Sequence, residues 1–202
     1  MNSFEQRKNE ILSKEDKSSI GKWDEKIKFL CEKINSFEEY YTTSSCSGRV
    51  VLMIDQDKKE SDLFKFVSHD LVDNLWEEVE KLDLNANIKF KQKQDKKSSI
   101  CPNLSYKFKQ EPCILHVACK NLEDAEKLLN LGRQAGWKKS GILSLGKKII
   151  VELNSTEKLE FPVVSNGKLL VDDNFIEEIS RISNEHLQKT WKKIENLEKS
   201  LV

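Results

Sequence analysis

The residue types best suited to chemistry are concentrated in Ser44-Ser45-Cys46-Ser47-Gly48-Arg49, between two predicted strands. A turn of small residues exposes backbone N–H groups that can hold an anion, and the guanidinium of Arg49 can grip a carboxylate or phosphate through two hydrogen bonds. The pattern therefore predicts a bound acidic group at this turn. A polar hairpin turn without a ligand is the alternative interpretation, and the pattern alone leaves it open.

Two histidines also occupy positions where chemistry is often found. Ser68-His69-Asp70 ends a predicted strand just before a helix, so His69 and Asp70 are suited to act as a general base and its orienting group. Capping of the following helix is the alternative. His116 lies inside an apolar strand, where alternation places it on one face with Ile114 and Ala118, turned toward a cleft or an edge. A core histidine satisfied by a neighbour is the default interpretation there.

Missing patterns exclude several kinds of site. The chain has no GxSxG, which excludes the usual serine hydrolase, and its three histidines lie too far apart in the chain to give a metal-ligand spacing. The five cysteines form no CxxC pair, which predicts free thiols in a reducing compartment. No GxGxxG follows a first strand, so the Rossmann route to a nucleoside cofactor is not indicated.

The charge of the chain is balanced as a whole but not locally. The 34 basic and 34 acidic residues cancel, which gives no support to a general nucleic-acid-coating protein. Between Lys89 and Lys109, however, seven lysines face a single acid, Asp95. Such a run can bind phosphates through counterion release, with Lys91, Lys93 and Lys107 as the candidate contacts. A solvated strand pair and loop is the alternative interpretation.

The elements that must position these residues are read from periodicity and cap signals. Apolar residues at helical spacing predict helices, and short apolar or alternating runs predict strands. The predicted helices cover 3–19, 24–36 with Asp24 as N-cap, 73–82 with Asp73 as N-cap, 121–136 with Asn121 as N-cap, and 173–201. The predicted strands cover 40–43, 50–54, 64–67, 87–92, 106–108, 113–119, 140–145, 148–153, 158–164 and 168–171, with a tight turn at Asn166-Gly167.

These elements predict an α+β fold with a mixed sheet layered with helices and a long C-terminal helix. A helix followed by a glycine-broken hairpin occurs at 24–54 and again at 121–153, which suggests a duplication of two related α/β units. A chain of 202 residues is expected to form one domain, 1–202. It has no apolar run near the roughly 20 residues of a membrane span and no secretory signal, so we expect a cytoplasmic protein.

The string TTSSCSGR at 42–49, preceded by a helix and by Ile34-Asn35, closely resembles the signature of the tRNA wybutosine-synthesizing protein 3 family. Shorter blocks agree with that family in order along residues 4 to 164. They are Phe4 with Arg7-Lys8, Asp16, Ser18-Ser19, Gly21, Asp24, FVSHD at 66–70, ILHVAC at 114–119, LEDAEKLL at 122–129 and SGI at 140–142. The lysine-rich region and the helix beyond about residue 172 match no motif of the family.

The resemblance implies a small methyltransferase that uses S-adenosylmethionine as donor and acts on phenylalanine tRNA. Members of the family are expected to methylate N4 of the tricyclic guanosine derivative that bears an aminocarboxypropyl side chain, next to the anticodon, in wybutosine biosynthesis. The fold is expected not to be the Rossmann one, and no metal is expected. Because a sulfonium is a good leaving group, positioning supplies most of the rate, and Cys46 need not act as a nucleophile.

The resemblance also suggests roles for the matching residues. We assign Ser45, Ser47, Gly48 and Arg49 to an anionic group, either the carboxylate of the donor or the amino acid arm of the base. His69 and Asp70 are assigned to positioning the purine and relaying its proton. His116, Ser140 and Gly141 are placed on the opposite wall of the donor site.

Two other hypotheses compete with the methyltransferase. A non-catalytic RNA-binding module would bind tRNA without affinity for S-adenosylmethionine. A general small-molecule binder would bind the donor without salt-dependent association with RNA.

Overall fold

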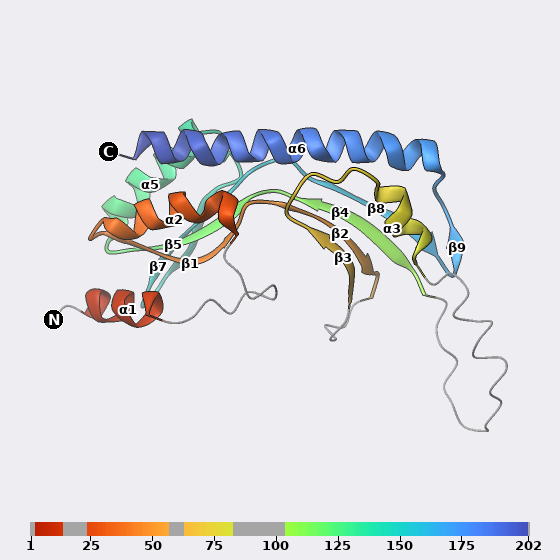
Figure 1. Ribbon diagram of the computed structural model, residues 1–202. Coiled ribbons are helices and arrows are strands. Elements are labelled where there is room, and N and C mark those ends of the chain that lie inside the picture. The colour runs from red at the N-terminus through yellow and green to blue at the C-terminus, as the bar shows by residue number, and fades with distance from the viewer. Residues whose placement is uncertain (1–2, 14–23, 57–62, 83–103, 202) are drawn as a thin grey trace, which may run out of the picture. The chain divides into compact units, whose positions relative to one another are not determined.

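The structure is a computed structural model that describes residues 3–13, 24–56, 63–82 and 104–201 (Figure 1). The chain divides into two compact units, each assembled from separate stretches of sequence. The first unit contains Met1–Gly48, Pro112–Glu157 and Leu187–Val202, and the second contains Arg49–Glu111 and Lys158–His186. The expectation of one domain over 1–202 stays a prediction. The predicted strand 87–92 lies outside the described residues.

The first unit is built on a four-stranded antiparallel sheet of order β1-β5-β7-β6. Its strands are β1 (Tyr40–Cys46), β5 (Ile114–Cys119), β6 (Gly141–Leu145) and β7 (Ile149–Asn154). Its helices are α1 (Ser3–Leu12), α2 (Glu25–Ser36), α5 (Leu122–Gln134) and the C-terminal half of α6 (Asp173–Ser200). The strand pair β6–β7 confirms the hairpin predicted at 140–153.

The two faces of this sheet are covered differently (Figure 1). One face packs against α2, α5 and α6 in the main core, where Leu115 and Val117 of β5 are fully buried. On the other face α1 packs through Phe4 against Tyr41 and Ala118. The alternation predicted for β5 is thereby confirmed, because Leu115, Val117 and Cys119 share the core face.

The second unit is built on a five-stranded antiparallel sheet of order β3-β2-β4-β8-β9. Its strands are β2 (Arg49–Ile54), β3 (Phe64–Ser68), β4 (Tyr106–Glu111), β8 (Leu159–Ser165) and β9 (Lys168–Leu169), accompanied by the helix α3 (Leu75–Glu80) and the N-terminal half of α6. Phe161 of β8 stacks on Phe108 of β4 and contacts Phe175 of α6. The predicted turn is confirmed, since Asn166 and Gly167 both have positive φ between β8 and β9.

The α+β class and the long C-terminal helix are confirmed, but the strands divide between two sheets. The hairpin predicted across 44–49 is wrong, because β1 pairs with β5 whereas β2 pairs with β3 and β4. Gly48, with φ of 99°, allows the chain to leave the first sheet before Arg49 enters the second. The helix–hairpin arrangement is therefore present at 121–153 and not at 24–54.

The helix caps follow the sequence with one correction. Asp24 accepts a hydrogen bond from the N–H of Lys26, and Asn121 accepts one from Asp124, as predicted. Asp73 is wrong as the cap of the next helix, because Asn74 accepts from the N–H of Glu77 in its place. Both residues have capping side chains, and the sequence pattern could not separate neighbours. No described helix is long and apolar enough to cross a membrane.

Candidate functional site

The family-specific segment begins with an irregularity in β1. The pairing register with β5 shifts between Thr42 and Ser44, so Thr43 is an extra residue, and its hydroxyl donates to the carbonyl of His116. Bulges of this kind re-aim the side chains that follow them and are frequent beside active sites. The shift brings Ser44, which is exposed, opposite His116.

Four residues from four strands form one line across the first sheet. Ser44 of β1 pairs with His116 of β5, His116 pairs with Glu152 of β7, and Glu152 pairs with Gly141 of β6. Directly opposite residues of antiparallel strands point to the same face, and neighbouring strands lie about 4.8 Å apart. We call these four residues the polar row. It lies on the sheet face that α1 covers only in part. His116 is two residues from the buried Ala118 on β5, on the same face.

The centre of the polar row is a hydrogen-bonded pair. His116 Nε2 lies 2.9 Å from Glu152 Oε2, and the two side chains are 28% and 24% exposed. Glu152 makes no ion pair with a lysine or arginine of the described chain. The carboxylate is therefore half-buried, and among the described residues its ion-pair partner is a histidine. Glu152 is not a site residue predicted from the sequence, because an acidic residue that alternates with apolar ones in VELN is typical of a solvent-facing position.

Gly141 is the last residue of the polar row and has no side chain. A Cβ built at Gly141 meets no atom of the described residues within 4 Å. Ser140, just before it, is held by the backbone: its hydroxyl donates to the carbonyl of Trp137 at 2.5 Å and accepts from the N–H of Asn154 at 3.0 Å. Ser140 thus fixes the entry of the chain into β6, and its predicted contact with a donor stays a prediction.

The other serines of the segment are more enclosed. Ser45 pairs with Leu115 on the opposite face of the sheet from His116. Ser47 is fully buried, and its N–H donates to Asp24 Oδ2 at 2.6 Å. Asp24 therefore both caps α2 and holds the end of the segment. The hydroxyl oxygen of Ser47 has no hydrogen-bond partner among the described residues.

Arg49 opens β2 in the second unit. Its Nε donates to Glu111 Oε2 at 2.6 Å, and its guanidinium lies 5.4 Å from the centre of the Phe64 ring. The Nη groups make no hydrogen bond with the described residues. Glu111 therefore orients the guanidinium through one edge and leaves the other edge for an anion, which is compatible with the predicted role.

The Ser68-His69-Asp70 tripeptide forms a tight turn after β3. Ser68 Oγ accepts from the N–H of Asp70 at 3.1 Å and donates to its carbonyl at 3.0 Å. Two residues further on, both backbone groups of Val72 bind the side-chain amide of Asn184 at 2.9 Å. The turn does not cap α3, so the alternative interpretation of this tripeptide is wrong. The proposed roles of His69 and Asp70 stay predictions.

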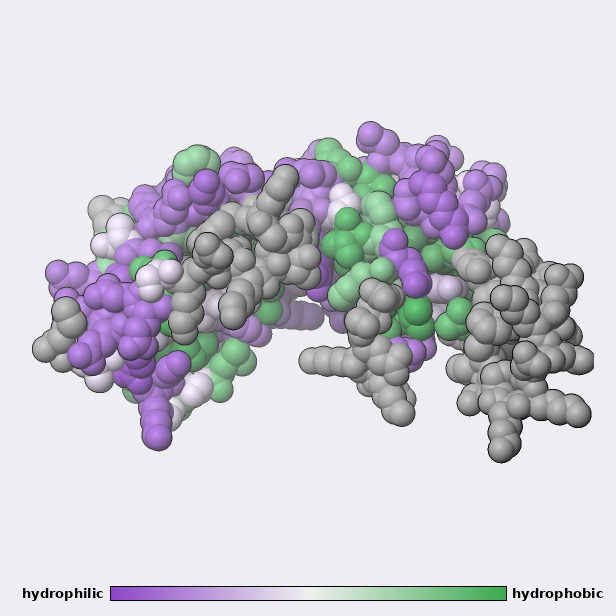
Figure 2. Space-filling view, turned by 60° about the horizontal axis from the view of Figure 1, so that its bottom comes forward, coloured by the Kyte–Doolittle hydropathy of each residue, from purple (hydrophilic) through white to green (hydrophobic). Residues whose placement is uncertain are grey.

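The candidate RNA contacts are only partly described. Lys107 lies on β4, where it pairs with Asp55 at 2.7 Å and with Glu160 at 3.7 Å. The hydrogen bond to Asp55 raises the pKa of Lys107, so its charge is present but already balanced. Figure 2 shows that the surface of the second unit mixes hydrophilic and hydrophobic residues. Lys91 and Lys93 lie outside the described residues.

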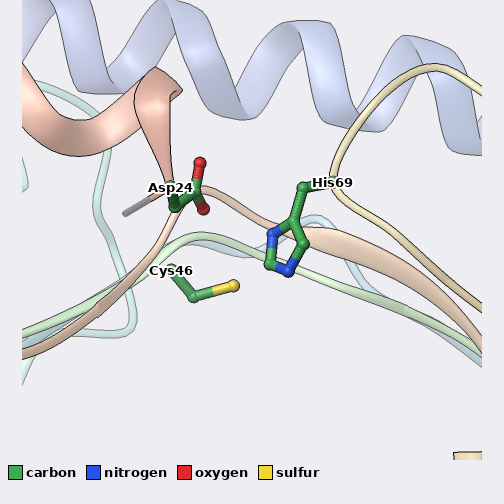
Figure 3. Close-up of side chains that lie close together, drawn as sticks. All are labelled: Asp24, Cys46 and His69. Atoms are coloured by element: carbon green, nitrogen blue, oxygen red, sulfur yellow. The ribbon is translucent and has the colours of Figure 1, made fainter. Parts of the chain in front are cut away.

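No disulfide joins the described cysteines, in line with the predicted thiols, and burial raises the pKa of both Cys113 and Cys119 to about 12. These two thiols therefore stay protonated near neutral pH and are poor nucleophiles. Figure 3 draws Cys46 and Asp24, both of the first unit, together with His69 of the second. Within either unit taken alone, no three histidine, cysteine or acidic side chains of the described chain are grouped to hold a metal ion.

Comparison with known proteins gives consistent matches over nearly the whole chain. The model of the family described as Methyltransferase TYW3 matches residues 6–202. A Thermococcus sibiricus protein named tRNA(Phe) 7-((3-amino-3-carboxypropyl)-4-demethylwyosine(37)-N(4))-methyltransferase is 34% identical over 96% of this chain and 91% of its own. A Danio rerio homolog of tRNA wybutosine-synthesizing protein 3 is 32% identical over 98% of this chain and 74% of its own. The solved structure of the PH1069 protein from Pyrococcus horikoshii OT3 has a TM-score of 0.76 at 34% identity, covering 98% of this chain and 93% of that one.

Proposed function

Because the chain belongs to the Methyltransferase TYW3 family, we propose that it methylates tRNA(Phe), taking the methyl group from S-adenosylmethionine. The acceptor is N4 of the tricyclic guanosine derivative that bears the aminocarboxypropyl side chain, next to the anticodon. The observation that carries the proposal is the 34% identity with the Thermococcus sibiricus methyltransferase, which extends over 91% of that protein. The same observation favours an enzyme over a non-catalytic RNA-binding module or a general small-molecule binder.

The polar row supports a ligand site in the first unit. It joins Ser44, His116 and Gly141, which the sequence places 72 and 25 positions apart, on one half-covered sheet face. Such convergence of polar groups from separate strands beside open space is typical of a binding site rather than of a solvated sheet face. We assign the donor to this row, with Ser45, Ser47, Gly48 and Ser140 shaping the backbone around it.

The chemistry asks for positioning and for the removal of one proton. A methyl group passes from the sulfonium to nitrogen in line, so the enzyme must hold the two reactants close and aligned. The nitrogen then loses its proton, and we assign this relay to His69 and Asp70 after β3. Arg49, oriented by Glu111, is assigned to an anionic group, either the donor carboxylate or the amino acid arm of the base.

No step of this reaction needs a metal ion, so we propose a metal-free enzyme. Dialysis against a strong chelator is expected to leave the rate of methyl transfer unchanged. The control is the same dialysis without chelator. Loss of activity that added Zn²⁺ restores would contradict a metal-free reaction.

The experiment for the proposed function combines the protein with methyl-labelled S-adenosylmethionine and tRNA from a cytoplasmic extract of a strain that lacks this methylation. Label is expected in tRNA(Phe), and its absence would contradict the proposed function. As a control, tRNA from the parent strain already carries the methyl group and is expected to accept none. Since the substrate is tRNA, we expect the protein in the cytoplasm.

A further inference from the structure

Glu152 dictates which ring nitrogen of His116 carries the proton. An ionised carboxylate accepts hydrogen bonds and cannot donate them, so Nε2, at 2.9 Å, is the donor in this pair. Neutral imidazole has one protonated nitrogen, and Nδ1 is then an acceptor. Nδ1 makes no hydrogen bond with a described residue. The pair therefore offers one well-defined acceptor that no described residue uses.

The register of the sheet keeps this acceptor in place. His116 and Glu152 are directly paired residues of adjacent central strands, and the flanking pairs Val117–Val151 and Leu115–Leu153 are buried in the main core. A slip of either strand by one residue would turn these apolar side chains to the other face, so the register is strongly specified. The histidine ring is thus held by packed strands on both sides.

The surroundings of the pair suit a ligand that brings N–H donors and positive charge. The carboxylate of Glu152 has no lysine or arginine partner among the described residues, although its side chain is only 24% exposed. On either side, Ser44 is exposed and Gly141 leaves open space. A half-buried carboxylate without a cation is costly unless a ligand supplies one.

We propose that Glu152 is a positioning residue for the donor: it fixes the Nε2–H tautomer of His116 so that Nδ1 accepts a hydrogen bond from an N–H group of S-adenosylmethionine. This inference rests on the proposed function. Two groups of the donor have the required chemistry, the ammonium group of its methionine part and the amino group of its adenine. The positive charge of the ammonium group also complements the carboxylate.

The first measurement observes the tautomer directly. In protein labelled with ¹⁵N-histidine, the His116 signals are assigned by comparison with His116→Gln. The wild type is expected to show the Nε2–H tautomer, and Glu152→Ala is expected to show a mixture. Glu152→Gln keeps an oxygen acceptor and should recover most of the tautomer preference. Unchanged tautomer signals in Glu152→Ala would overturn the inference.

The second measurement asks whether the tautomer matters for binding. Calorimetry with S-adenosylhomocysteine is expected to show about tenfold weaker binding for Glu152→Ala, equivalent to about 1.4 kcal/mol. Glu152→Gln should lie within about threefold of the wild type, or about 0.7 kcal/mol on the same conversion. Glu126→Gln, an exposed change on α5, is the matched control and should bind normally. Equal affinities of wild type and Glu152→Ala would overturn the inference.

A third titration identifies the N–H group. Methylthioadenosine keeps the adenine and lacks the ammonium group. If Glu152→Ala loses affinity for both ligands, Nδ1 binds the adenine amino group. If Glu152→Ala loses affinity for S-adenosylhomocysteine alone, Nδ1 binds the ammonium group. If the wild type binds neither ligand and transfers no label to tRNA, the proposed function fails together with this inference. If the wild type binds the ligand and transfers label to tRNA, and Glu152→Ala binds the ligand equally well, this inference fails while the proposed function stands.

Discussion

A substitution at Gly141 tests whether the end of the polar row belongs to a ligand site or is an ordinary sheet edge. Its φ is not in the left-handed region and a Cβ meets no described atom within 4 Å, so the fold does not require glycine there. We expect Gly141→Ala to keep or slightly raise the melting temperature, because alanine narrows the unfolded ensemble. Binding of S-adenosylhomocysteine should nevertheless weaken about tenfold, or about 1.4 kcal/mol, because the methyl group enters the space beside Glu152.

Gly146 provides the matched control for this change, since its Cβ position is equally open and it lies in the β6–β7 connection. Gly146→Ala should bind the ligand as the wild type does. Calorimetry and thermal melts on both variants make the comparison. Equal binding by Gly141→Ala and Gly146→Ala would mean that the end of the polar row is not part of the donor site.

Arg49 is expected to serve binding more than stability. Its ion pair with Glu111 is between side chains that are 27% and 30% exposed, and pairs of that kind contribute at most about 1 kcal/mol. Arg49→Ala should therefore leave the fold intact in a thermal melt while donor or tRNA affinity falls. Arg49→Lys keeps the charge without the planar fork and should recover little. Wholesale destabilisation of Arg49→Ala would show that the residue is structural.

The individual residues show what a sequence can and cannot reveal. Ser44, His116 and Gly141 were found through a family signature, which carries function directly. Glu152 was missed because its meaning depends on the residue opposite it on a neighbouring strand, which alternation does not encode. Ser140 was predicted from the family resemblance to contact the donor. Its hydrogen bonds to the backbone of Trp137 and Asn154 are visible only in the structure.

Within the first unit, a partly buried ion pair joins α6 to the chain that follows β7. Lys193 of α6 contacts Glu157 at 2.6 Å, with side chains 18% and 13% exposed, and Ser155 also donates to Glu157. Burial alone would raise the pKa of this carboxyl, but the hydrogen bonds from Lys193 and Ser155 outweigh it and lower the pKa to about 2. The ionised form is thus favoured in the folded state.

A depressed carboxyl pKa contributes stability that is complete above the ordinary value near 4.5 and is lost as the pH falls toward about 2. Glu157→Gln should lower the free energy of unfolding by about 1–2 kcal/mol at pH 7. The difference from wild type should shrink in denaturant titrations below pH 4.5. Glu195→Gln, an exposed change on the same helix, is the control. A difference that does not depend on pH would contradict the assignment.

Helices and strands were predicted well because their signals are local. Apolar spacing and N-cap residues gave α2 and α5, and an Asn-Gly turn gave the β8–β9 connection. Strand partners are not local: β1 and β2 follow each other in the chain, yet they join different sheets. A glycine between two strands is compatible with a hairpin and with a change of sheet, and only the packing of the apolar faces distinguishes them.

For the molecule as a whole, the net charge is zero, so we expect RNA binding to depend on the lysine-rich region between Lys89 and Lys109. Changing Lys91 and Lys93 to alanine should reduce the slope of tRNA affinity against salt by nearly one unit for each phosphate that the protein no longer neutralises. Lys107→Ala should change the slope less, because Asp55 and Glu160 already balance its charge. Filter binding over a range of salt concentrations tests both. An unchanged slope in the double variant would move the tRNA surface elsewhere, for example to Lys189 and Lys192.

The two units were not anticipated, because each collects stretches that are far apart in the sequence. Composition and periodicity report on segments, whereas the assignment of a segment to a unit depends on which apolar faces bury each other. The family signature shows the limit clearly, since TTSSCSGR ends with one residue, Arg49, that belongs to the second unit. The resemblance therefore predicted the function more completely than it predicted the architecture.

We propose that this chain methylates N4 of the aminocarboxypropyl-bearing base of tRNA(Phe). The most direct measurement is mass spectrometry of nucleosides from tRNA(Phe) of a strain lacking this step, after incubation with the protein and S-adenosylmethionine. We expect this nucleoside to gain the mass of one methyl group, located on the tricyclic base by fragmentation. We expect Gly141→Ala to slow this gain. An unchanged nucleoside, or a methyl group found elsewhere in the tRNA, would contradict this proposal.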